Sequence, residues 1–536
     1  MNVINRAMRR VIRAAMNGSG AARSAISRGL PALMIAAMAG NAFGANLTWV
    51  GDGSGNAWDL GTSSMWNDGS VAAVYTDGDA VTLDDTGSDS PAINLTTTVS
   101  PASVTVNNST KNYTIAGAGS LAGTMTLTKS GTNTLTLCTT NTFSGVVTVS
   151  GGIVNLAPPG NVTMANQFTG SGVGFRKSGA NKLIISGGSK RHIDYWCGSV
   201  TVDGGILQFG TSSSVTYSGF YRASAYTVNS GATMEMIGQS TLRYDVPWTV
   251  NGGTVRSTGY NQVGTLTLNG GILEAVNGYN GTYRAIALNG HVTVIGSVPS
   301  VIRQTGSSNL GIHLGVNTGL PVKTFSVADV TGDTNADLTV SAILFNSQTW
   351  TTAFGLIKAG AGTMVMSAGN GYTGATTVNA GTLLVSGSLA SPTVNVNNGG
   401  TLLVSGIAPL PSALVTVASN GTFGAAGTVA TSVTNLTFAE GSKAAWTYDG
   451  GAQTAGLVNV TGTLTLPAAA TIDLSGTGPL RSGQVLFSAT AGTVAGATDL
   501  SGWTINNAPE GTYASILLID KQVILQTVRG TVIQIL

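Results

Sequence analysis

A strand–turn–strand unit of about 20 residues recurs along this chain, and it constrains the fold more than any other feature. Short Asn/Gly turns at 228–231, 250–253 and 268–271 follow one another at nearly even intervals. Further on, Gly381, Gly400 and Gly421 mark corners at a similar spacing. Gly and Asn adopt the positive φ of a tight corner at low cost. The period therefore predicts one rung of a β-solenoid per unit.

Longer copies of the unit confirm the repeat within the sequence. Residues 129–137 (KSGTNTLTL), 177–185 (KSGANKLII) and 358–366 (KAGAGTMVM) align without gaps. The first and third reach a second shared block, at Gly145 and Gly374, after the same interval. The second copy reaches it later, at Gly198, so that copy carries a five-residue insertion. Apolar residues alternate within the blocks, as in strands with one buried face. We expect an all-β parallel β-helix; β-sandwiches in series would need strands spaced by about 8–12 residues.

Charge is scarce: charged residues make up 9% of the chain, against about 25% in ordinary globular domains. The formal net charge is +2, and a nucleic-acid binder would need a basic face. Two Cys cannot build a disulfide scaffold or a Cys-rich metal site. We therefore expect no nucleic-acid partner.

The segment 1–45 has the pattern of a secretory signal peptide. It contains six Arg and no acid, then the apolar run 30–39 and small residues around 42–45. The apolar run is too short for a stable transmembrane helix. The alternative is an amphipathic helix belonging to the fold. No later segment has the length and apolarity of a membrane helix, which predicts a secreted or surface-bound mature protein.

Three blocks resemble a known family. Residues 129–137, 141–145 (NTFSG) and 370–385 (NGYTGATTVNAGTLLV) are similar to autotransporter-associated β-strand repeats, which occur in passenger regions of bacterial secreted and surface proteins. The resemblance implies a right-handed parallel β-helix and a place at the bacterial surface, outside the outer membrane. It also implies a C-terminal membrane β-barrel in self-transporting members. The sequence stops at Leu536 without a recognisable barrel, so we expect export by another system or a translocator outside this gene.

These patterns divide the chain into four expected parts. They are a signal peptide (1–45), an acidic, Trp-containing N-terminal β cap (46–120), the β-helix array (121–470) and a C-terminal β segment that closes the solenoid (471–536).

The cap is a candidate metal site. Residues 46–89 hold eight Asp and no Lys or Arg, and clustered carboxylates suit Ca²⁺, the one cofactor considered. The candidate ligands are Asp77, Asp79, Asp84 and Asp85. The alternative is a solvated acidic cap, with Trp49, Trp58 and Trp66 forming its small core and covering the first rung.

The five-residue insertion falls within 187–197, on an expected loop, and loops on rigid scaffolds often carry binding sites. Aromatic residues and Arg gather there and over the next rungs, a combination that suits sugar rings and acidic polysaccharide. The candidate glycan-binding residues are Arg191, Tyr195, Trp196, Tyr221, Arg222, Arg243, Tyr244, Tyr283 and Arg284. The alternative is that the aromatic side chains pack as ladders between rungs.

An enzyme is the competing hypothesis, since β-helices also carry polysaccharide lyases and glycoside hydrolases. Glycoside hydrolysis needs two carboxylates about 5–10 Å apart, and outside the cap no acid pair recurs at the rung period. We therefore predict no catalytic residues. The predicted function is a structural rod or adhesin that contacts glycan or cell-envelope partners or associates with itself.

Overall fold

The structure is a computed structural model, and it describes residues 44–186, 196–212, 220, 222–239, 245–277, 284–306, 311–316, 320–346, 352–406 and 409–529. The expected signal peptide lies almost wholly outside these residues. The described part is all-β, as predicted: it forms strands β1 to β52 and contains no helix. Accordingly, none of its elements is a helix of the kind that could span a bilayer.

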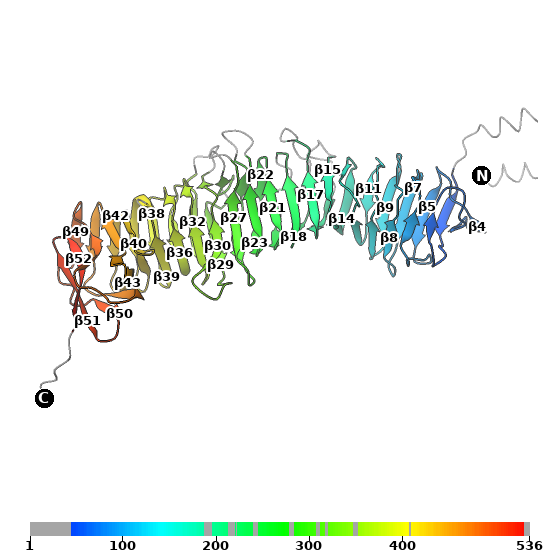
Figure 1. Cartoon of the computed structure of the whole chain (residues 1–536). Helices are drawn as coiled ribbons and strands as arrows, with labels where there is room; N and C mark the ends of the chain where they lie inside the picture. The colour runs from blue at the N-terminus through cyan, green and yellow to red at the C-terminus, as the bar shows by residue number, and fades with distance from the viewer. Residues whose placement is uncertain are drawn as a thin grey trace, which may run out of the picture.

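Successive rungs stack into an elongated rod (Figure 1). In the first long sheet, β5 (Ala80–Asp84), β7 (Ser103–Asn107) and β9 (Thr126–Ser130) pair in parallel, one strand from each rung. The second long sheet runs in parallel from β13 (Val162–Met164) to β50 (Thr504–Asn506). The strands that follow β13 are β15 (Lys182–Ile185), β17 (Gly205–Phe209), β19 (Ala232–Met236), β21 (Thr254–Ser257), β24 (Ile272–Ala275), β27 (Ser300–Gln304) and β30 (Ala336–Val340). The predicted parallel β-solenoid is therefore confirmed.

The rung length varies more than the sequence repeat suggests. Val378 of β35 (Thr376–Val378) pairs with Val396 of β38 (Thr393–Val396), which pairs with Val417, so these rungs keep close to the period of the repeat. In the middle of the rod Val292 pairs with Phe325 and Phe325 with Lys358, and each of these rungs is much longer. The middle rungs add a third sheet and longer connections. The strands of that sheet are β22 (Asn261–Val263), β25 (Ile286–Leu288), β28 (Ile312–His313) and β31 (Leu344–Phe345).

Inward side chains stack in columns because equivalent residues of adjacent rungs are register partners. Met364 of β33 (Thr363–Met366), Leu383 of β36 (Gly381–Val385), Leu402 of β39 (Gly400–Val404) and Phe423 pair in sequence, and all four are fully buried. Burial of each such side chain stabilises the folded state by about 1.5–3 kcal/mol relative to leaving it exposed to water.

Glycine is required where successive corners meet. Gly152 has φ +65°, and a Cβ there would lie 2.3 Å from the carbonyl oxygen of Asn133. Gly381 has φ +63°, with the Gly360 carbonyl oxygen 2.5 Å from a Cβ position. These close contacts explain why glycine recurs at the corner of successive rungs.

Antiparallel strands close both ends of the rod. At one end β1 (Asn46–Trp49) pairs with β3 (Trp66–Asn67), and β3 with β4 (Ala72–Ala73). At the other, β52 (Gln522–Arg529) pairs with β48 (Gln484–Ser488) and β51 (Thr512–Ile519). Figure 1 shows β4 and β52 at opposite extremes. Parallel pairing begins with β1 on β5 and continues to β50.

The N-terminal cap has the predicted tryptophan core. Trp49, Trp58 and Trp66 are at most 1% exposed. The Trp66 ring lies edge-on to the other two, with ring centres 4.9 and 5.0 Å away.

Candidate binding face

Only three of the nine predicted glycan-binding residues can be placed. Trp196, Arg222 and Arg284 are described, and Arg222 is exposed. The other six, Arg191, Tyr195, Tyr221, Arg243, Tyr244 and Tyr283, lie outside the described residues.

Two of the three placed residues are in the interior, where a surface glycan does not reach. Trp196, at the start of β16 (Trp196–Val202), is fully buried, with its ring centre 5.5 Å from that of Phe220. Arg284 is 7% exposed, and its guanidinium lies 4.3 Å from the ring centre of Phe345. Burial lowers the pKa of Arg284. The structure thus corrects the expected surface position of both residues, and for Trp196 it supports the packing alternative.

Other aromatic residues of this stretch also form ladders between rungs. Tyr226 of β18 (Ala225–Asn229) and Trp248 of β20 (Trp248–Asn251) are register partners. Their rings stack with centres 4.3 Å apart, and both are buried.

The four candidate calcium ligands are not brought together. Asp77 accepts the N–H of Ser100 at 2.7 Å, and Asp79 accepts that of Thr76 at 2.8 Å. Asp85 accepts backbone N–H groups from 109–111, and Asp84 accepts the N–H of Thr86. Within the described ranges, no group of three or more His, Cys, Asp or Glu could hold a metal. The expected calcium cluster is therefore corrected: these carboxylates accept hydrogen bonds from backbone N–H groups in different turns.

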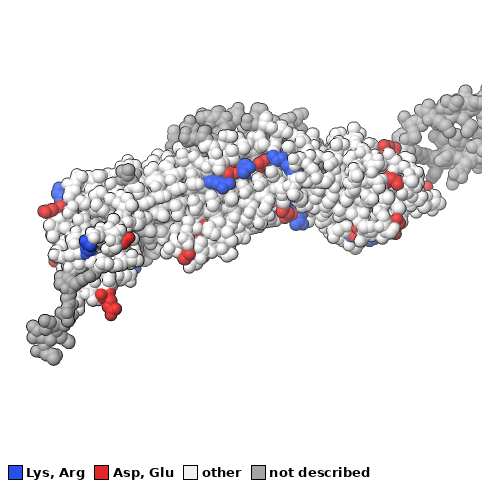
Figure 2. Space-filling view, in the orientation of Figure 1, with Lys and Arg blue, Asp and Glu red and all other residues white. Residues whose placement is uncertain are grey.

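A different set of polar residues does converge, and we call it the charge column. It consists of Lys182, Gln208, Glu235, Arg256, Glu274 and Arg303. The last five occupy one outward position on five consecutive strands, β17, β19, β21, β24 and β27, and each is the register partner of the next. Lys182 reaches across from β15. Figure 2 shows alternating positive and negative side chains along the middle of a rod whose visible face is otherwise largely uncharged.

Ion pairs link the column from end to end. The Lys182 Nζ lies 2.8 Å from Glu235 Oε2 and 2.7 Å from the Gln208 side-chain oxygen. Arg256 bridges two acids, with Nη1 3.2 Å from Glu235 and Nε 2.6 Å from Glu274. Arg303 Nε lies 2.9 Å from the other Glu274 oxygen. Each glutamate therefore has two cationic partners.

The acids are recessed and the cations project. The Glu235 and Glu274 side chains are 12% and 3% exposed, against 27%, 37% and 38% for Lys182, Arg256 and Arg303. Burial alone would raise the pKa of Glu274, but the hydrogen bond from Arg256 and the charges of Arg256 and Arg303 hold it below its usual value. The glutamate is thus kept ionised beneath a row of positive tips.

Sequence reasoning missed this column, although a signal was present. Gln208, Arg256 and Glu274 each lie three positions after the last Gly of a turn, and Glu235 lies three positions after Ala232. Aligning the units on their turns would have placed these side chains in one line.

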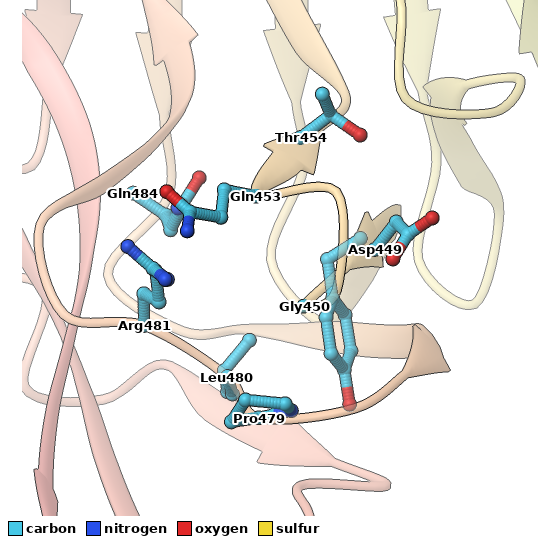
Figure 3. Close-up of a pocket in the computed structure, with 9 residues that line it drawn as sticks. Asp449, Gly450, Gln453, Thr454, Pro479, Leu480, Arg481 and Gln484 are labelled. Atoms are coloured by element: carbon cyan, nitrogen blue, oxygen red, sulfur yellow. The ribbon is translucent and has the colours of Figure 1, made fainter.

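A hollow near the C-terminal end bears on the enzyme alternative (Figure 3). It lies between the 449–454 hairpin and the 479–484 segment. Asp449 is the single acid among the lining residues, and its Oδ1 accepts N–H groups from Gly451 and Ala452. The hollow does not supply the carboxylate pair of a glycoside hydrolase.

Comparison with known proteins agrees with the repeat. The Passenger-associated-transport-repeat family matches residues 127–156 and 356–385. The chain is autotransporter passenger-like. Over 273 residues it is 29% identical to the "Adhesin BmaC autotransporter" of Brucella suis biovar 1 (strain 1330). That alignment covers 48% of this chain and 7% of the relative's own length. No solved structure matches significantly.

Both passenger-repeat matches contain a fully buried lysine, Lys129 and Lys358, and Lys177 takes the same place in the remaining copy. The Lys358 Nζ donates to the carbonyl oxygens of Ala359, Gly360 and Ala380 at 3.1, 2.8 and 3.0 Å. Lys129 and Lys177 make the equivalent three contacts. Burial lowers the pKa of each to about 8. In this passenger-like chain the repeat lysine therefore joins two successive corners.

Proposed function

We propose that this chain is a surface-exposed or secreted rod with an adhesin-like role that contacts glycan or other cell-envelope components, and that it is not an enzyme. The observation that carries the proposal is the similarity to an adhesin autotransporter over 273 residues. The passenger repeats and the stacked rungs support it. A solenoid presents long, regular surfaces rather than a single deep cleft, and such surfaces suit extended partners.

The test is binding of the purified chain to a glycan array, together with adhesion of beads coated with the chain to host or bacterial cells. We expect retention on specific glycans and adhesion above that of uncoated beads. A blank array together with no adhesion would contradict the proposal. Release of reducing ends or unsaturated products from a polysaccharide panel would favour the lyase or glycoside hydrolase alternative.

Calcium dependence is proposed separately, from the acidic composition of the cap. Repeating the array with Ca²⁺ and with a chelator tests it. If calcium is needed, chelation should lower retention, and adding Ca²⁺ back in excess of the chelator should restore it.

A further inference from the structure

The chemistry of the charge column points to a class of partner. Its cations stand on an outer face, in line with the rod axis (Figure 2). Arg256 and Arg303 lie two strands apart, on β21 and β27, which corresponds to about 10 Å at the usual strand spacing. The Lys182 ammonium lies beside β17 and β19, next to Gln208 and Glu235. The positive tips thus form a row along the rod, in which Arg256 and Arg303 stand two strands apart.

The row retains unused hydrogen-bond donors. Among its contacts with described residues, Arg303 pairs through Nε alone, which leaves both terminal amino groups free to bind a ligand. Arg256 uses Nε and Nη1, so its second terminal amino group is also free in this part of the chain. A guanidinium fork suits carboxylate and sulfate groups.

A strip of methyl-bearing side chains runs directly beside the column. It consists of Ile206, Thr233, Thr254, Ile272 and Val301, which are register partners from β17 to β27 and are all half-buried. The C–H faces of sugar rings pack well against such a surface. Cations beside an apolar strip therefore match a polymer with ring faces and regularly spaced acidic groups.

The recessed glutamates also have a role in this arrangement. By pairing with Glu235 and Glu274, the long cationic side chains are fixed before any ligand arrives, which reduces the entropy lost on binding. Three cations against two acids leave the column with a net charge of only +1. So weak a positive field does not suit nucleic acid, whose binding relies on many phosphate contacts.

We infer that the charge column and its methyl-bearing strip bind an acidic polysaccharide lying along the rod, with acidic groups at about every second rung. This inference rests on the proposed contact with glycan and names its chemical class. The acidic groups lie against Lys182, Arg256 and Arg303, and the sugar rings lie over the strip from Ile206 to Val301.

The test measures affinity for polygalacturonate, with neutral dextran as the control polymer, using the full chain and three variants. The first variant, Lys182→Gln with Arg303→Gln, removes two cations but leaves Arg256 paired with both glutamates. The second, Glu235→Gln with Glu274→Gln, removes the acids and keeps every cation. The matched control is Arg176→Gln, which removes an exposed arginine paired with Asp203, outside the column.

We expect the cation variant to bind polygalacturonate about tenfold more weakly, with Arg176→Gln unchanged. The acid variant should bind several-fold more tightly, because the loss of two negative charges outweighs the loss of the pairing that fixes the cations. Added salt should weaken wild-type binding. Tighter binding by the acid variant cannot result from misfolding, and circular dichroism checks the cation variant. Equal affinity of both column variants and wild type, or no wild-type binding to polygalacturonate, would overturn the inference. Retention on neutral glycans alone would overturn it while leaving the proposed function standing; a blank array with no cell adhesion would remove both.

Discussion

The buried repeat lysine shows how one side chain can supply hydrogen bonds to the carbonyl groups at a corner of the solenoid. Where the chain turns at Gly360, carbonyl groups from two successive rungs point toward a space closed to water, and unpaired buried carbonyls are costly. A lysine ammonium has three donors, and Lys358 directs all of them to these oxygens. The cost of burying the charge is thereby offset by hydrogen bonds that an apolar residue could not make.

Replacing Lys358 by methionine should therefore lower the free energy of unfolding by about 3 kcal/mol, because the shape is kept while three carbonyl groups lose their donor. The matched control is Lys443→Met, since Lys443 is half-buried at an outward position of β43 (Ser442–Asp449); it should change stability by less than about 0.5 kcal/mol. Urea unfolding followed by circular dichroism measures both. An equal decrease in the free energy of unfolding of the two variants would show that the three hydrogen bonds of Lys358 do not stabilise the fold.

At the scale of strands and turns, the N-terminal cap depends on ionised aspartates. Backbone N–H groups of Asn56, Ser54 and Gly55 lower the pKa of Asp52 to about 2. Backbone N–H groups of Thr110, Ser109 and Lys111 likewise lower the pKa of Asp85, against the opposing effect of burial. A folded-state pKa below the unfolded value of about 3.9 gives stability that is present above pH 4 and is lost as pH falls toward 2.

Acidification from pH 5 to pH 2 should therefore lower the hydrogen-exchange protection factors of residues 46–116 before those of residues 356–425, which contain no Asp or Glu. Protection factors are compared because the intrinsic exchange rate of amides itself falls on acidification in this range. Peptide-resolved hydrogen–deuterium exchange compares the two segments in one sample. Asp52→Asn with Asp85→Asn should flatten the pH response of the cap and leave the other segment unchanged. Simultaneous opening of both segments at low pH would contradict this account.

The strands were predictable because burial on one face imposes a period of two, and the corners because few residues accept positive φ. Whether a residue after an insertion points into the core or out to solvent could not be predicted. Trp196 follows the five-residue insertion, and a shift of one residue there exchanges inward and outward positions. The charge column was missed for another reason: its members are far apart in sequence and meet only once the rungs are in register.

At the scale of the whole molecule, each rung contacts its neighbours above and below, so stability should add up rung by rung. The segment 376–417 is regular enough to test this. β36 pairs residue for residue with β39, and β35 pairs with β38, which pairs with β40 (Leu410–Val417). Because successive rungs of this segment pair in the same register, the strands of one rung can take the place of those of the rung before it. One rung should therefore be removable without leaving unpaired strand edges.

Deleting residues 381–399 joins Ala380 to Gly400, which takes the place of Gly381 and keeps the Lys358 contact with the Ala380 carbonyl. We expect this variant to melt cooperatively within roughly 5 °C of wild type. Deleting only 381–390 removes β36 but keeps β38. The second long sheet then loses a strand while the first keeps its own, so the strands of the two sheets no longer match rung by rung. That variant should lose cooperative melting, as followed by circular dichroism. If the whole-rung deletion unfolds the chain as fully as the shorter one, the rungs are not independent units, and the rod must depend on contacts beyond nearest neighbours.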